Sequence, residues 1–390
     1  MARFTVQLDE NAEEARTHAL VIGVGAYRHL IGGPQEVANP HGLGQLSSPP
    51  VSAREFATWL LTEYNEPNKP LGSLALLLSE AVPGPFRDPR TGREHSVEEA
   101  TIDNIDAAVR EWKARADLRD DDRIVFYFCG HGVSLGNDMS LLASDVFADQ
   151  ESPLNGALNF TELWRGLIRC RAAEQVFFVD ACRAGPDRLI RQAGGGFAGR
   201  VPIAGQERPA GFAPREYAVY YATLDGEGSH ARTGQVSLFT DALLRSLAGS
   251  GSENTDDDVW RVSTPALQLA IGRFMKEPQF AGEFAGVQVP VSPESFDFGL
   301  HELTGDPVVP VYIGCSPRED NEFAEFLCRG GRMPELRRAL ADIDASDPTA
   351  EWPLDLPLGE YAVEARFDGR PPRGSRLGVR PPLRRIGLKP

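Results

Sequence analysis

Two segments carry side chains that could act together as a nucleophile and a base. Residues 176–185 have the sequence Val-Phe-Phe-Val-Asp-Ala-Cys-Arg-Ala-Gly, which places Cys182 where an apolar run breaks into a turn. Residues 123–132 end a second apolar run on Gly-His-Gly, and His131 precedes Cys182 by roughly 50 residues. A thiol with the usual pKa of about 8.5 is mostly protonated at neutral pH, so a nearby imidazole would activate it for attack on a carbonyl carbon.

The same segments contain backbone groups that such an attack requires. The tetrahedral intermediate carries an oxyanion that fixed N–H groups stabilise, and Gly132 and Cys182 lie in turns whose amides could supply them. Taken singly, a cysteine at the end of an apolar strand is most often a buried core residue, and Gly-His-Gly is most often a turn. Their occurrence together after two consecutive strand-like runs favours a catalytic pair.

Strand-like runs alternate with helix-like segments, and this order predicts how the pair is positioned. Apolar runs rich in β-branched and aromatic residues are typical of parallel strands buried on both faces, and functional groups collect at the carboxyl ends of such strands. The order predicts an α/β fold with a mostly parallel sheet between helices. The expected strands are residues 18–27, 71–78, 123–128, the run before Cys182 and 217–223. The expected helices are residues 51–64, 96–112 (begun by a Ser96-x-x-Glu99 capping pattern), 159–170 and 238–247.

At these motifs the chain resembles the caspase-like cysteine peptidases, the group that holds caspases, metacaspases and bacterial relatives. Gly-His-Gly at 130–132 and Asp-Ala-Cys-Arg at 180–183 carry the resemblance, which extends to the first strand, to Gly…Phe-Thr at 234–240 and to Gln-x-Pro at 288–290. It covers roughly residues 17–300. The resemblance implies a caspase-like sheet and an endopeptidase with Cys182 as nucleophile and His131 as general base and acid.

The acid two residues before the nucleophile bears on what is cut. Caspases that cut after aspartate have a glutamine there, whereas this chain has Asp180, as metacaspases do, where the acid helps to bind Arg or Lys. A carboxylate in a partly desolvated pocket favours a cation, and Arg offers bidentate geometry. We therefore predict cleavage after Arg and then Lys. The alternative is that Asp180 only caps the following turn.

One part of the family's pocket is missing. Metacaspases typically carry an Asn-Asp-Ala segment with a second pocket acid, where this chain has Val51-Ser52-Ala53. The second acid must then come from elsewhere or be absent. The candidates are Asp225 and Glu227, because the resemblance implies that the loop after strand 217–223 forms a wall of the pocket.

The interval that follows the nucleophile is long and rich in glycine and proline. Residues 183–215 are therefore predicted to form a flexible loop. In caspase relatives the corresponding connection can be cut during maturation, so we predict self-cleavage after one arginine of this loop; a mobile but uncut active-site loop is the alternative. The candidate sites are Arg188, Arg191, Arg200 and Arg208.

Composition and charge exclude several classes of protein. The 390 residues include 40 basic and 56 acidic ones, and the net charge of −16 disfavours nonspecific binding to nucleic acid. No run approaches the roughly 18 apolar residues of a membrane span, and the amino terminus lacks a hydrophobic signal region. We therefore expect a cytoplasmic protein that binds neither nucleic acid nor membrane.

Cofactor and metal motifs are also missing from the sequence. The five cysteines show no paired Cys-x-x-Cys spacing, which argues against a disulfide framework or a zinc site, so we expect all except Cys182 to be structural. Arg28 replaces the third glycine of a dinucleotide loop at residues 23–28, and the acidic runs at 120–122 and 256–258 lack the pattern of an EF-hand. We expect no cofactor and no metal.

Beyond about residue 305 the sequence pattern changes. We predict a peptidase domain at residues 1–305 and an accessory module at 306–390 that is β-rich or α+β, with a packing extension of the peptidase as the alternative. Residues 307–313 and 356–367 are strand-like, whereas 321–327 and 333–340 are helix-like. The tail after Asp368 holds basic residues and no acid; such tails are most often solvated or packed on an acidic surface, and docking to a partner is the alternative.

The sequence thus predicts a caspase-like cysteine endopeptidase that cuts protein substrates at exposed Arg or Lys residues. An activating protein partner is compatible with this prediction. The resemblance alone suggests a bacterial pathway of the regulated defence or cell-death type. Two other hypotheses stay open. One is a caspase-like scaffold whose main role is binding and whose dyad is occluded until a partner arrives, and the other is an acyl transferase without proteolytic activity.

Overall fold

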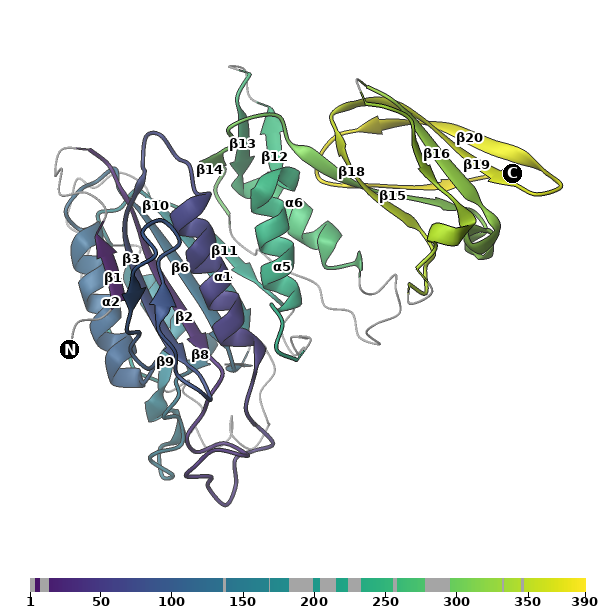
Figure 1. Ribbon diagram of the computed structural model, residues 1–390. Helices are drawn as coiled ribbons and strands as arrows, with labels where there is room; N and C mark the ends of the chain where they lie inside the picture. Colours follow the sequence, from purple (N-terminus) through teal and green to yellow (C-terminus); the bar gives the residue numbers. More distant parts are fainter. Residues whose placement is uncertain are drawn as a thin grey trace. The chain divides into compact units, whose positions relative to one another are not determined.

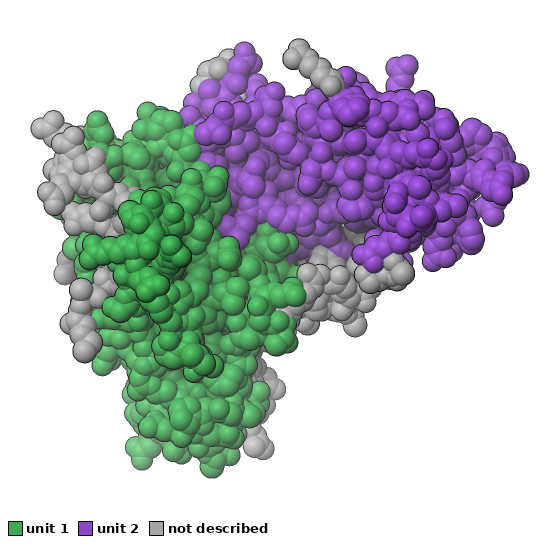
Figure 2. Space-filling view, in the orientation of Figure 1, with its two compact units in different colours: residues 1–241, 288–298 green, residues 242–287, 299–390 purple. Residues whose placement is uncertain are grey.

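The computed structural model describes residues 4–7, 14–135, 138–167, 169–181, 199–203, 215–223, 233–254, 258–277, 295–331, 333–344 and 347–390. The chain divides into two units, each described by itself below and coloured separately in Figure 2. The first holds residues 1–241 and 288–298, and the second holds residues 242–287 and 299–390. The catalytic segments predicted from the sequence all belong to the first unit.

The first unit is built on a six-stranded sheet in the order β1-β3-β2-β6-β10-β11 (Figure 1). β1 is antiparallel to β3, and the other neighbours are parallel, which confirms the predicted mostly parallel sheet. Almost every described side chain of the central strands is buried, as expected for strands covered on both faces. The strands are β1 (Phe4–Gln7), β2 (Thr17–Val24), β3 (Leu71–Ser79), β6 (Arg123–Gly130), β10 (Glu174–Ala181) and β11 (Glu216–Tyr221).

Helices cover both faces of this sheet. Neighbouring side chains of a strand point to opposite faces, and the ring of Tyr127 stacks on Phe56 of α1 (Ser48–Thr62) at 4.6 Å between centroids. The neighbouring Phe126 instead packs against α2 (Ile102–Ala116) and α3 (Phe160–Leu167). α1 therefore covers one face, and α2 and α3 cover the other. The remaining helix of the sequence prediction is α5 (Leu238–Arg245), followed by a π-helical turn, η2 (Ser246–Ser250).

Gly23, within β2, and Gly25, just after its end, allow close packing against the segment that begins α1. A Cβ atom at Gly23 would lie 2.7 Å from the carbonyl oxygen of Pro49, and one at Gly25 would lie 2.4 Å from that of Leu46. Only a residue without a side chain lets the segment that begins α1 come this close. The Gly-x-Gly pattern thus has a structural explanation that requires no nucleotide.

The predicted start of α2 is wrong. The Ser96-x-x-Glu99 pattern does not begin the helix, because the carboxylate of Glu99 is bound by Arg28 and by the Ser144 hydroxyl, 2.8 Å away. Thr101 is the N-cap instead, and its hydroxyl accepts a hydrogen bond from the Asn104 amide. A tertiary contact therefore overrides the local capping signal.

A smaller sheet continues from the carboxyl end of β6. β7 (Gly132–Leu135), β8 (Asp138–Leu142) and β9 (Ala157–Asn159) pair antiparallel in the order β7-β8-β9, and η1 (Pro153–Gly156) precedes β9. β4 (Phe86–Arg87) and β5 (Glu94–His95) form a separate hairpin. Because only His131 separates β6 from β7, the central sheet and the smaller sheet both fix the backbone around it.

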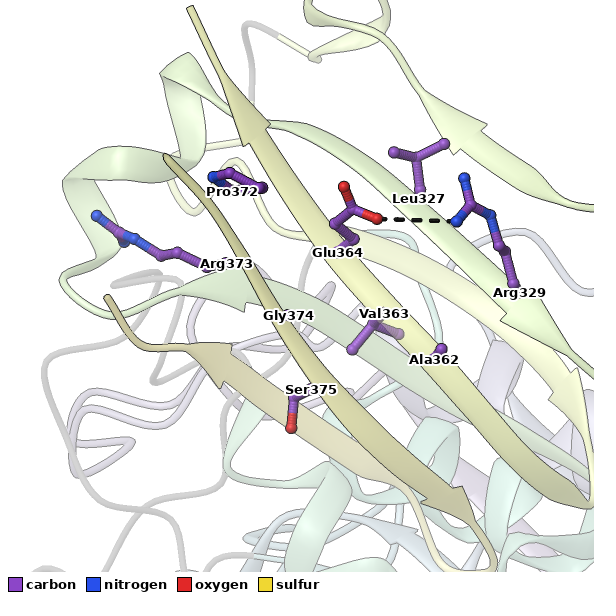
Figure 3. Close-up of a pocket in the computed structure, with 9 residues that line it drawn as sticks. All are labelled: Leu327, Arg329, Ala362, Val363, Glu364, Pro372, Arg373, Gly374 and Ser375. Carbon is purple, nitrogen blue, oxygen red and sulfur yellow. Dashed lines mark ion pairs between the residues drawn. The ribbon is translucent and has the colours of Figure 1, made fainter. Parts of the chain in front are cut away.

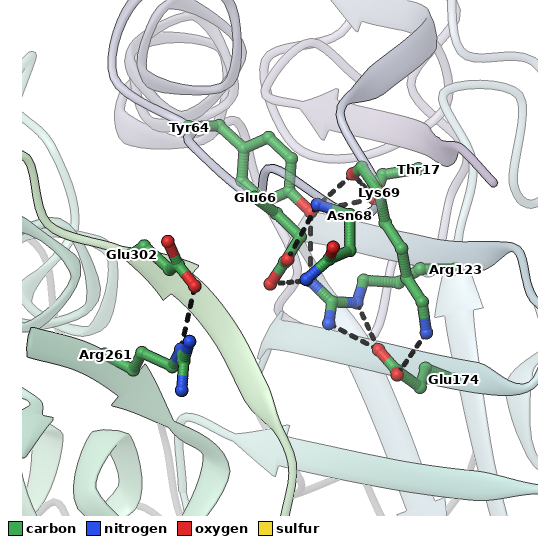
Figure 4. A network of polar contacts seen from close by, with 9 residues as sticks. All are labelled: Thr17, Tyr64, Glu66, Asn68, Lys69, Arg123, Glu174, Arg261 and Glu302. Carbon is green, nitrogen blue, oxygen red and sulfur yellow. Dashed lines mark hydrogen bonds and ion pairs between the residues drawn. The ribbon is translucent and has the colours of Figure 1, made fainter. Parts of the chain in front are cut away.

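A network of charged and polar groups joins the opposite, amino edge of the central sheet (Figure 4). Arg123 is the first residue of β6 and is 2% exposed. Its guanidinium donates to Glu174, the first residue of β10, and to the Tyr64 hydroxyl at 3.0 Å. Thr17, the first residue of β2, contacts the same hydroxyl at 2.8 Å, and Lys69 pairs with Glu174. The first residues of three neighbouring strands are thereby tied together.

The second unit is mostly β-structure and includes the helix α6 (Thr264–Phe274). A three-stranded and a four-stranded sheet, in the orders β18-β15-β21 and β17-β16-β19-β20, share a buried core that includes Val311, Phe326 and Val363. A further sheet, β12-β13-β14, lies in the same unit. The strands are β12 (Ser252–Asn254), β13 (Trp260–Ser263), β14 (Gly299–Glu302), β15 (Val308–Cys315), β16 (Glu325–Gly330), β17 (Leu336–Arg338), β18 (Trp352–Pro357), β19 (Gly359–Phe367), β20 (Arg370–Val379) and β21 (Arg384–Leu388).

The β-rich character of the carboxyl-terminal region is confirmed, but its two predicted helices are wrong. Residues 321–327 hold the end of a 3₁₀ turn, η3 (Arg318–Phe323), and the start of β16, and residues 333–340 hold β17 and the start of η4 (Leu340–Asp342). Arg338 is buried and donates to three backbone carbonyls, those of Asn321, Ala324 and Ala350. These long-range bonds favour extended backbone over the helix that the local pattern favours. The division at residue 305 stays a prediction.

Part of the basic tail is used within the second unit. Arg370 and Arg373 both pair with Asp320, and Arg385 pairs with Glu351 at 3.2 Å. Arg370 is exposed in spite of its pair, and the other exposed basic residues of the tail are Arg376, Arg380, Arg384 and Lys389. Docking of this tail to a partner stays a prediction. Among the residues that the structure describes, no helix is both long and apolar enough to cross a membrane.

Candidate active site

His131 lies at the carboxyl edge of the central sheet, directly after β6. Its neighbour Gly130 is the register partner of Ala181, the last residue of β10. Cys182 lies outside the described residues, but the peptide bond to Ala181 keeps it one residue from this pairing. Neighbouring strands of a sheet lie about 4.8 Å apart. The parallel register of β6 and β10 therefore brings the two chain segments that carry the predicted dyad side by side.

Three hydrogen bonds fix His131. Its backbone N–H donates to the Tyr27 hydroxyl at 2.8 Å, and its carbonyl accepts from the Leu142 amide at 2.9 Å. Its ring nitrogen Nε2 is 2.8 Å from the carbonyl oxygen of Gly44. The Tyr27 and His131 rings are also in contact, with 4.9 Å between centroids. Both the backbone and the ring of the histidine are thus held in place.

The Gly44 contact sets the tautomer of His131. A carbonyl oxygen only accepts hydrogen bonds, so Nε2 must carry the proton in this contact. In the neutral ring Nδ1 then has a free lone pair and can act as a base. Burial lowers the pKa of His131 from its usual value of 6.5, while the bond to Gly44 acts in the opposite direction. The neutral, proton-accepting form is therefore favoured near neutral pH.

The amide of Gly132 is oriented away from the strand that pairs with it. Gly132 faces Leu141 in the antiparallel pair of β7 and β8, and the bond from Leu142 N–H to His131 C=O frames this position. Opposite residues of an antiparallel pair alternate between hydrogen-bonded and non-hydrogen-bonded. The frame makes Gly132 and Leu141 a non-hydrogen-bonded pair, so this ladder does not use the Gly132 N–H. That donor fits its predicted role towards an oxyanion.

Asp180 is 2% exposed and lies in a buried polar cluster on the α1 side of the sheet. Its Oδ2 atom accepts hydrogen bonds from the hydroxyls of Ser237 and Thr240, the latter at 2.9 Å, and from the Cys129 thiol at 3.3 Å. Ser237 also accepts from the Thr240 amide, which caps the first turn of α5. The contacts of Asp180 thus tie β10 to the start of α5, a structural role that the sequence prediction did not include.

Ser52 stands where the resemblance implied a second pocket acid, and it belongs to the same cluster. The Ser52 side chain is fully buried, and its Oγ accepts from the Ser237 amide at 3.0 Å. A hydroxyl therefore occupies this position beside Asp180. The other two candidates for the second acid, Asp225 and Glu227, lie outside the described residues.

The four described cysteines are buried. Burial, with a further contribution from the charge of Asp180, raises the pKa of Cys129 well above its usual value. Burial beside Asp117 raises the pKa of Cys170 to about 12, and burial also raises the pKa of Cys315 and Cys328. A thiol that stays protonated is a poor nucleophile. These four cysteines therefore do not compete with Cys182 for the role of nucleophile.

Of the predicted self-cleavage sites, Arg200 is described, and Arg188, Arg191 and Arg208 lie outside the described residues. The Arg200 amide donates to the Ala157 carbonyl at 2.7 Å, and its carbonyl accepts from the Asn159 amide at 3.0 Å. Its side chain pairs with Asp103 at 3.1 Å. Arg200 is therefore bound to the edge of β9 by both of its backbone groups.

A cavity of about 290 Å³ lies elsewhere, in the second unit, among β16, β19 and β20 (Figure 3). Charged side chains on its walls are already paired. Arg329 lies 3.8 Å from Glu364, and Arg373 pairs with Asp320. Among the residues that the structure describes, none of those predicted to act in catalysis lines it. This cavity is therefore not part of the predicted site.

Sequence analysis missed the residues that hold His131, namely Tyr27, Gly44 and Gln45. Tyr27 gave one usable signal, because it follows β2 at the same carboxyl edge as the predicted dyad. Gly44 gave none, since it acts through a backbone carbonyl that any residue possesses. Gln45 lies in an irregular segment and is recognised only by its hydrogen bonds to the Tyr27 backbone.

Comparisons with known proteins show which proteins the chain is similar to. Residues 16–264 match the family model described as Caspase domain (Peptidase C14). The chain is 28% identical over 281 residues to an uncharacterized protein of Sinorhizobium fredii, covering 71% of this chain and 79% of that protein. It is 31% identical over 207 residues to a protein of a Desulfuromonadales bacterium named as a probable protease, which covers 51% of this chain but only 23% of that relative.

Two solved structures are similar over most of their length. Caspase-1 from Spodoptera frugiperda matches with a TM-score of 0.42 and 14% identity, over 76% of this chain and 94% of that one. A protein of Geobacter sulfurreducens matches with a TM-score of 0.42 and 17% identity, over 75% and 95%. With TM-scores of 0.42, neither structure supports an interpretation of the site. The family of the chain is shown by the family model.

Proposed function

The chain belongs to the caspase domain family, and we propose that it is a cysteine endopeptidase that cleaves proteins after arginine and then lysine. The observation that carries the proposal is the bond between His131 Nε2 and Gly44 O. This bond leaves the Nδ1 lone pair free to act as a base, and the register of β6 and β10 places the His131 segment beside the end of β10, which Cys182 follows in the chain. The place of His131 supports the proposal as well, because functional groups collect at the carboxyl edge of a parallel sheet.

The proposed reaction uses one proton acceptor and one nucleophile. His131 Nδ1 takes the thiol proton of Cys182, and the thiolate attacks the carbonyl carbon of the scissile peptide bond. The N–H groups of Gly132 and Cys182 stabilise the oxyanion. His131 returns the proton to the leaving amine as the C–N bond breaks and a thioester forms. Water, deprotonated by His131, then hydrolyses the thioester and regenerates the thiol.

The preference for basic residues rests on the position of Asp180. Alternate residues of a strand point to the same face, so the Asp180 side chain lies with Phe178 on the face of β10 that α1 covers, two residues before Cys182 in the chain. Its carboxylate is surrounded by the hydroxyl and thiol groups of the cluster around α5. In a poorly solvated site a carboxylate attracts a substrate guanidinium or ammonium group. A substrate side chain must displace some of these neutral donors to reach it.

Self-processing is part of the proposal, and the structure sharpens where the cut would fall. A peptidase needs its substrate extended and free of its own backbone partners, whereas Arg200 is bound to β9 through both backbone groups. Cleavage after Arg200 would first require this segment to detach. We therefore favour Arg188, Arg191 or Arg208 as the site. Intact-mass analysis of wild-type and Cys182→Ala protein tests this: an active wild type without a cut in residues 183–215 would contradict it.

We place the activity in the cytoplasm, on protein substrates with exposed Arg or Lys residues and under the control of an activating protein. Bacterial members of the family suggest a regulated defence or cell-death pathway. The net charge of −16 supports basic rather than acidic substrates.

An electrophilic peptide that ends in arginine tests the function directly. We expect it to label wild-type protein at Cys182, with no label on Cys182→Ala and a stoichiometric mass increase by intact-mass spectrometry. Peptide substrates ending in Arg, Lys and Asp then test specificity, and a preference for Asp would refute the assignment of Asp180. No labelling under any condition would favour the scaffold hypothesis, and a transferred acyl product without hydrolysis would favour the acyl transferase.

A further inference from the structure

The side chain of Gln45 makes three hydrogen bonds to the backbone near the proposed catalytic histidine, and we call this set of bonds the Gln45 clamp. Its Oε1 accepts from the Tyr27 amide at 2.7 Å, and its Nε2 donates to the carbonyls of Tyr27 and Ile31, both at 3.0 Å. One side chain thus satisfies both backbone groups of Tyr27. Tyr27 is itself 1% exposed, and its hydroxyl accepts the bond from the His131 backbone.

The sequence position of Gln45 gives this clamp a second consequence. Gln45 directly follows Gly44, whose carbonyl binds the His131 ring. Flanking bonds hold the segment on either side: Ile31 N–H donates to the Leu43 carbonyl at 3.0 Å, and Leu46 N–H donates to the Gly25 carbonyl at 2.8 Å. Between these two bonds, the Gln45 side chain connects the Gly44 segment to Tyr27. It therefore links the group that holds the ring of His131 to the group that holds its backbone.

We propose that Gln45 is a positioning residue, which acts through Gly44 and Tyr27 to keep His131 in the Nε2–H tautomer with Nδ1 as the base. The kinetic consequence rests on the proposed function, whereas the tautomer does not. The role requires an amide, because one side chain must accept from an N–H and donate to two carbonyls. A carboxylate there would place its negative charge against both carbonyl oxygens, and an alanine would make none of these bonds.

The geometry also predicts which kinetic constant changes. The Gln45 side chain bonds to the backbone of its own loop, so its loss should leave substrate binding almost intact. A shift of the Gly44 carbonyl would instead weaken the Nε2 bond and let the ring populate the other tautomer, in which Nδ1 carries the proton. Misplacement of a reacting group by about 1 Å can reduce the rate on the order of 100-fold. We therefore expect kcat to fall and KM to stay close to that of the wild type.

Three variants test the clamp: Gln45→Ala, Gln45→Glu and, as a matched control, Gln35→Ala, which removes an exposed glutamine of the same loop. With a peptide substrate ending in arginine, we expect kcat to fall about 10- to 100-fold in Gln45→Ala and at least as far in Gln45→Glu. The control should stay within about twofold of the wild type. Because Gln45 is itself exposed, both variants should fold, and a cooperative thermal transition will show it.

A second measurement does not depend on catalysis. Nitrogen-15 spectra of histidine-labelled protein report the tautomer of each ring, and the His131 signals are assigned by comparison with His131→Ala. We expect the Nε2–H form in the wild type and in Gln35→Ala, and a mixture of tautomers in Gln45→Ala. Wild-type kcat together with an unchanged tautomer in Gln45→Ala would overturn the inference. If the wild type cleaves no peptide, the proposed function fails, and an unchanged tautomer alone would overturn the role of Gln45.

Discussion

The amino and carboxyl edges of the central sheet are built from the same strands but held by different kinds of contact. At the amino edge, charged side chains of opposite sign meet: Arg123 and Lys69 both pair with Glu174. At the carboxyl edge, the contacts that hold His131 come from a tyrosine hydroxyl and two backbone groups, which carry no charge. One continuous register pairs β6 with β10, from Arg123 and Glu174 at the amino edge to Gly130 and Ala181 at the carboxyl edge. The same strand pairing therefore positions the residues of both edges.

This difference separates stability from reactivity. A buried ion network strongly opposes the loss of one partner, since the other is then left charged and unpaired. A buried histidine held by neutral groups has a lowered pKa, so its ring stays neutral and keeps a free lone pair. Substitutions at the amino edge should therefore change folding and spare catalysis, whereas those at the carboxyl edge should do the reverse.

The largest expected effect is at the carboxyl edge. Replacing Cys182 or His131 by alanine removes the nucleophile or the base, and we expect kcat/KM to fall by about 10⁴-fold or more in either variant. Residues that act as one unit are not additive, so the double variant should be no slower than the worse single one. Urea unfolding should show little loss of stability in Cys182→Ala. A substantial residual rate that is equal in the two single variants and lower in the double variant would mean that the two residues act independently.

The next largest effect is expected in the buried polar cluster around Asp180. Asp180→Asn removes the charge, and we expect kcat/KM for peptides ending in arginine to fall about 100-fold relative to peptides ending in an uncharged residue. Ser237→Ala is the matched control, because it removes a hydroxyl donor to the same carboxylate and leaves the charge. It should lower the stability by about 1–3 kcal/mol, as expected for a buried acceptor that loses a donor, and keep the arginine preference. Equal loss of preference in both variants would show that Asp180 acts only through the packing of α5.

At the amino edge, Arg123→Met should cost about 3–5 kcal/mol of folding free energy, because Glu174 and Glu66 lose their buried partner. The activity per folded molecule should stay at the wild-type level. Arg110→Met breaks an exposed pair with Asp106 and should change the stability by no more than about 0.5 kcal/mol. Urea titrations of the three proteins measure these differences. A large loss of kcat in folded Arg123→Met would contradict the claim that the amino edge affects stability and not catalysis.

How far the sequence predicts this molecule also differs between the edges. The strands and the position of His131 follow from local patterns: apolar runs of strand length that end on Gly-His-Gly and Asp-Ala-Cys. The amino-edge network is invisible in those patterns, because Arg123 and Glu174 look like ordinary polar residues that begin a strand. Their partner Tyr64 comes from a loop, and only the folded chain brings the three together.

The errors have the same physical origin. The capping pattern at Ser96 failed because Glu99 is taken by Arg28 from another part of the chain. The two helices predicted after residue 320 are wrong because the buried contacts of Arg338, and the core that two sheets of the second unit share, favour strands. The predictions for Asp180, a substrate contact or a cap of the following turn, did not include its bonds to Ser237 and Thr240, since nothing local indicates them. Local patterns therefore locate elements and chemistry but miss the long-range polar contacts that complete the site.

The smallest expected effect tests whether the carboxyl edge is truly held by neutral groups. His131 must be neutral to accept a proton, and burial lowers its pKa below 6.5, so the acid limb of kcat/KM should have its midpoint below pH 6.5. The sign follows because a lower pKa keeps the base unprotonated at lower pH. The causes of this shift are burial and a backbone carbonyl, not a charged side chain, so added salt should leave the midpoint unchanged. A midpoint above 6.5 would instead reveal that a carboxylate acts on the ring, as Glu174 acts on Arg123 at the amino edge.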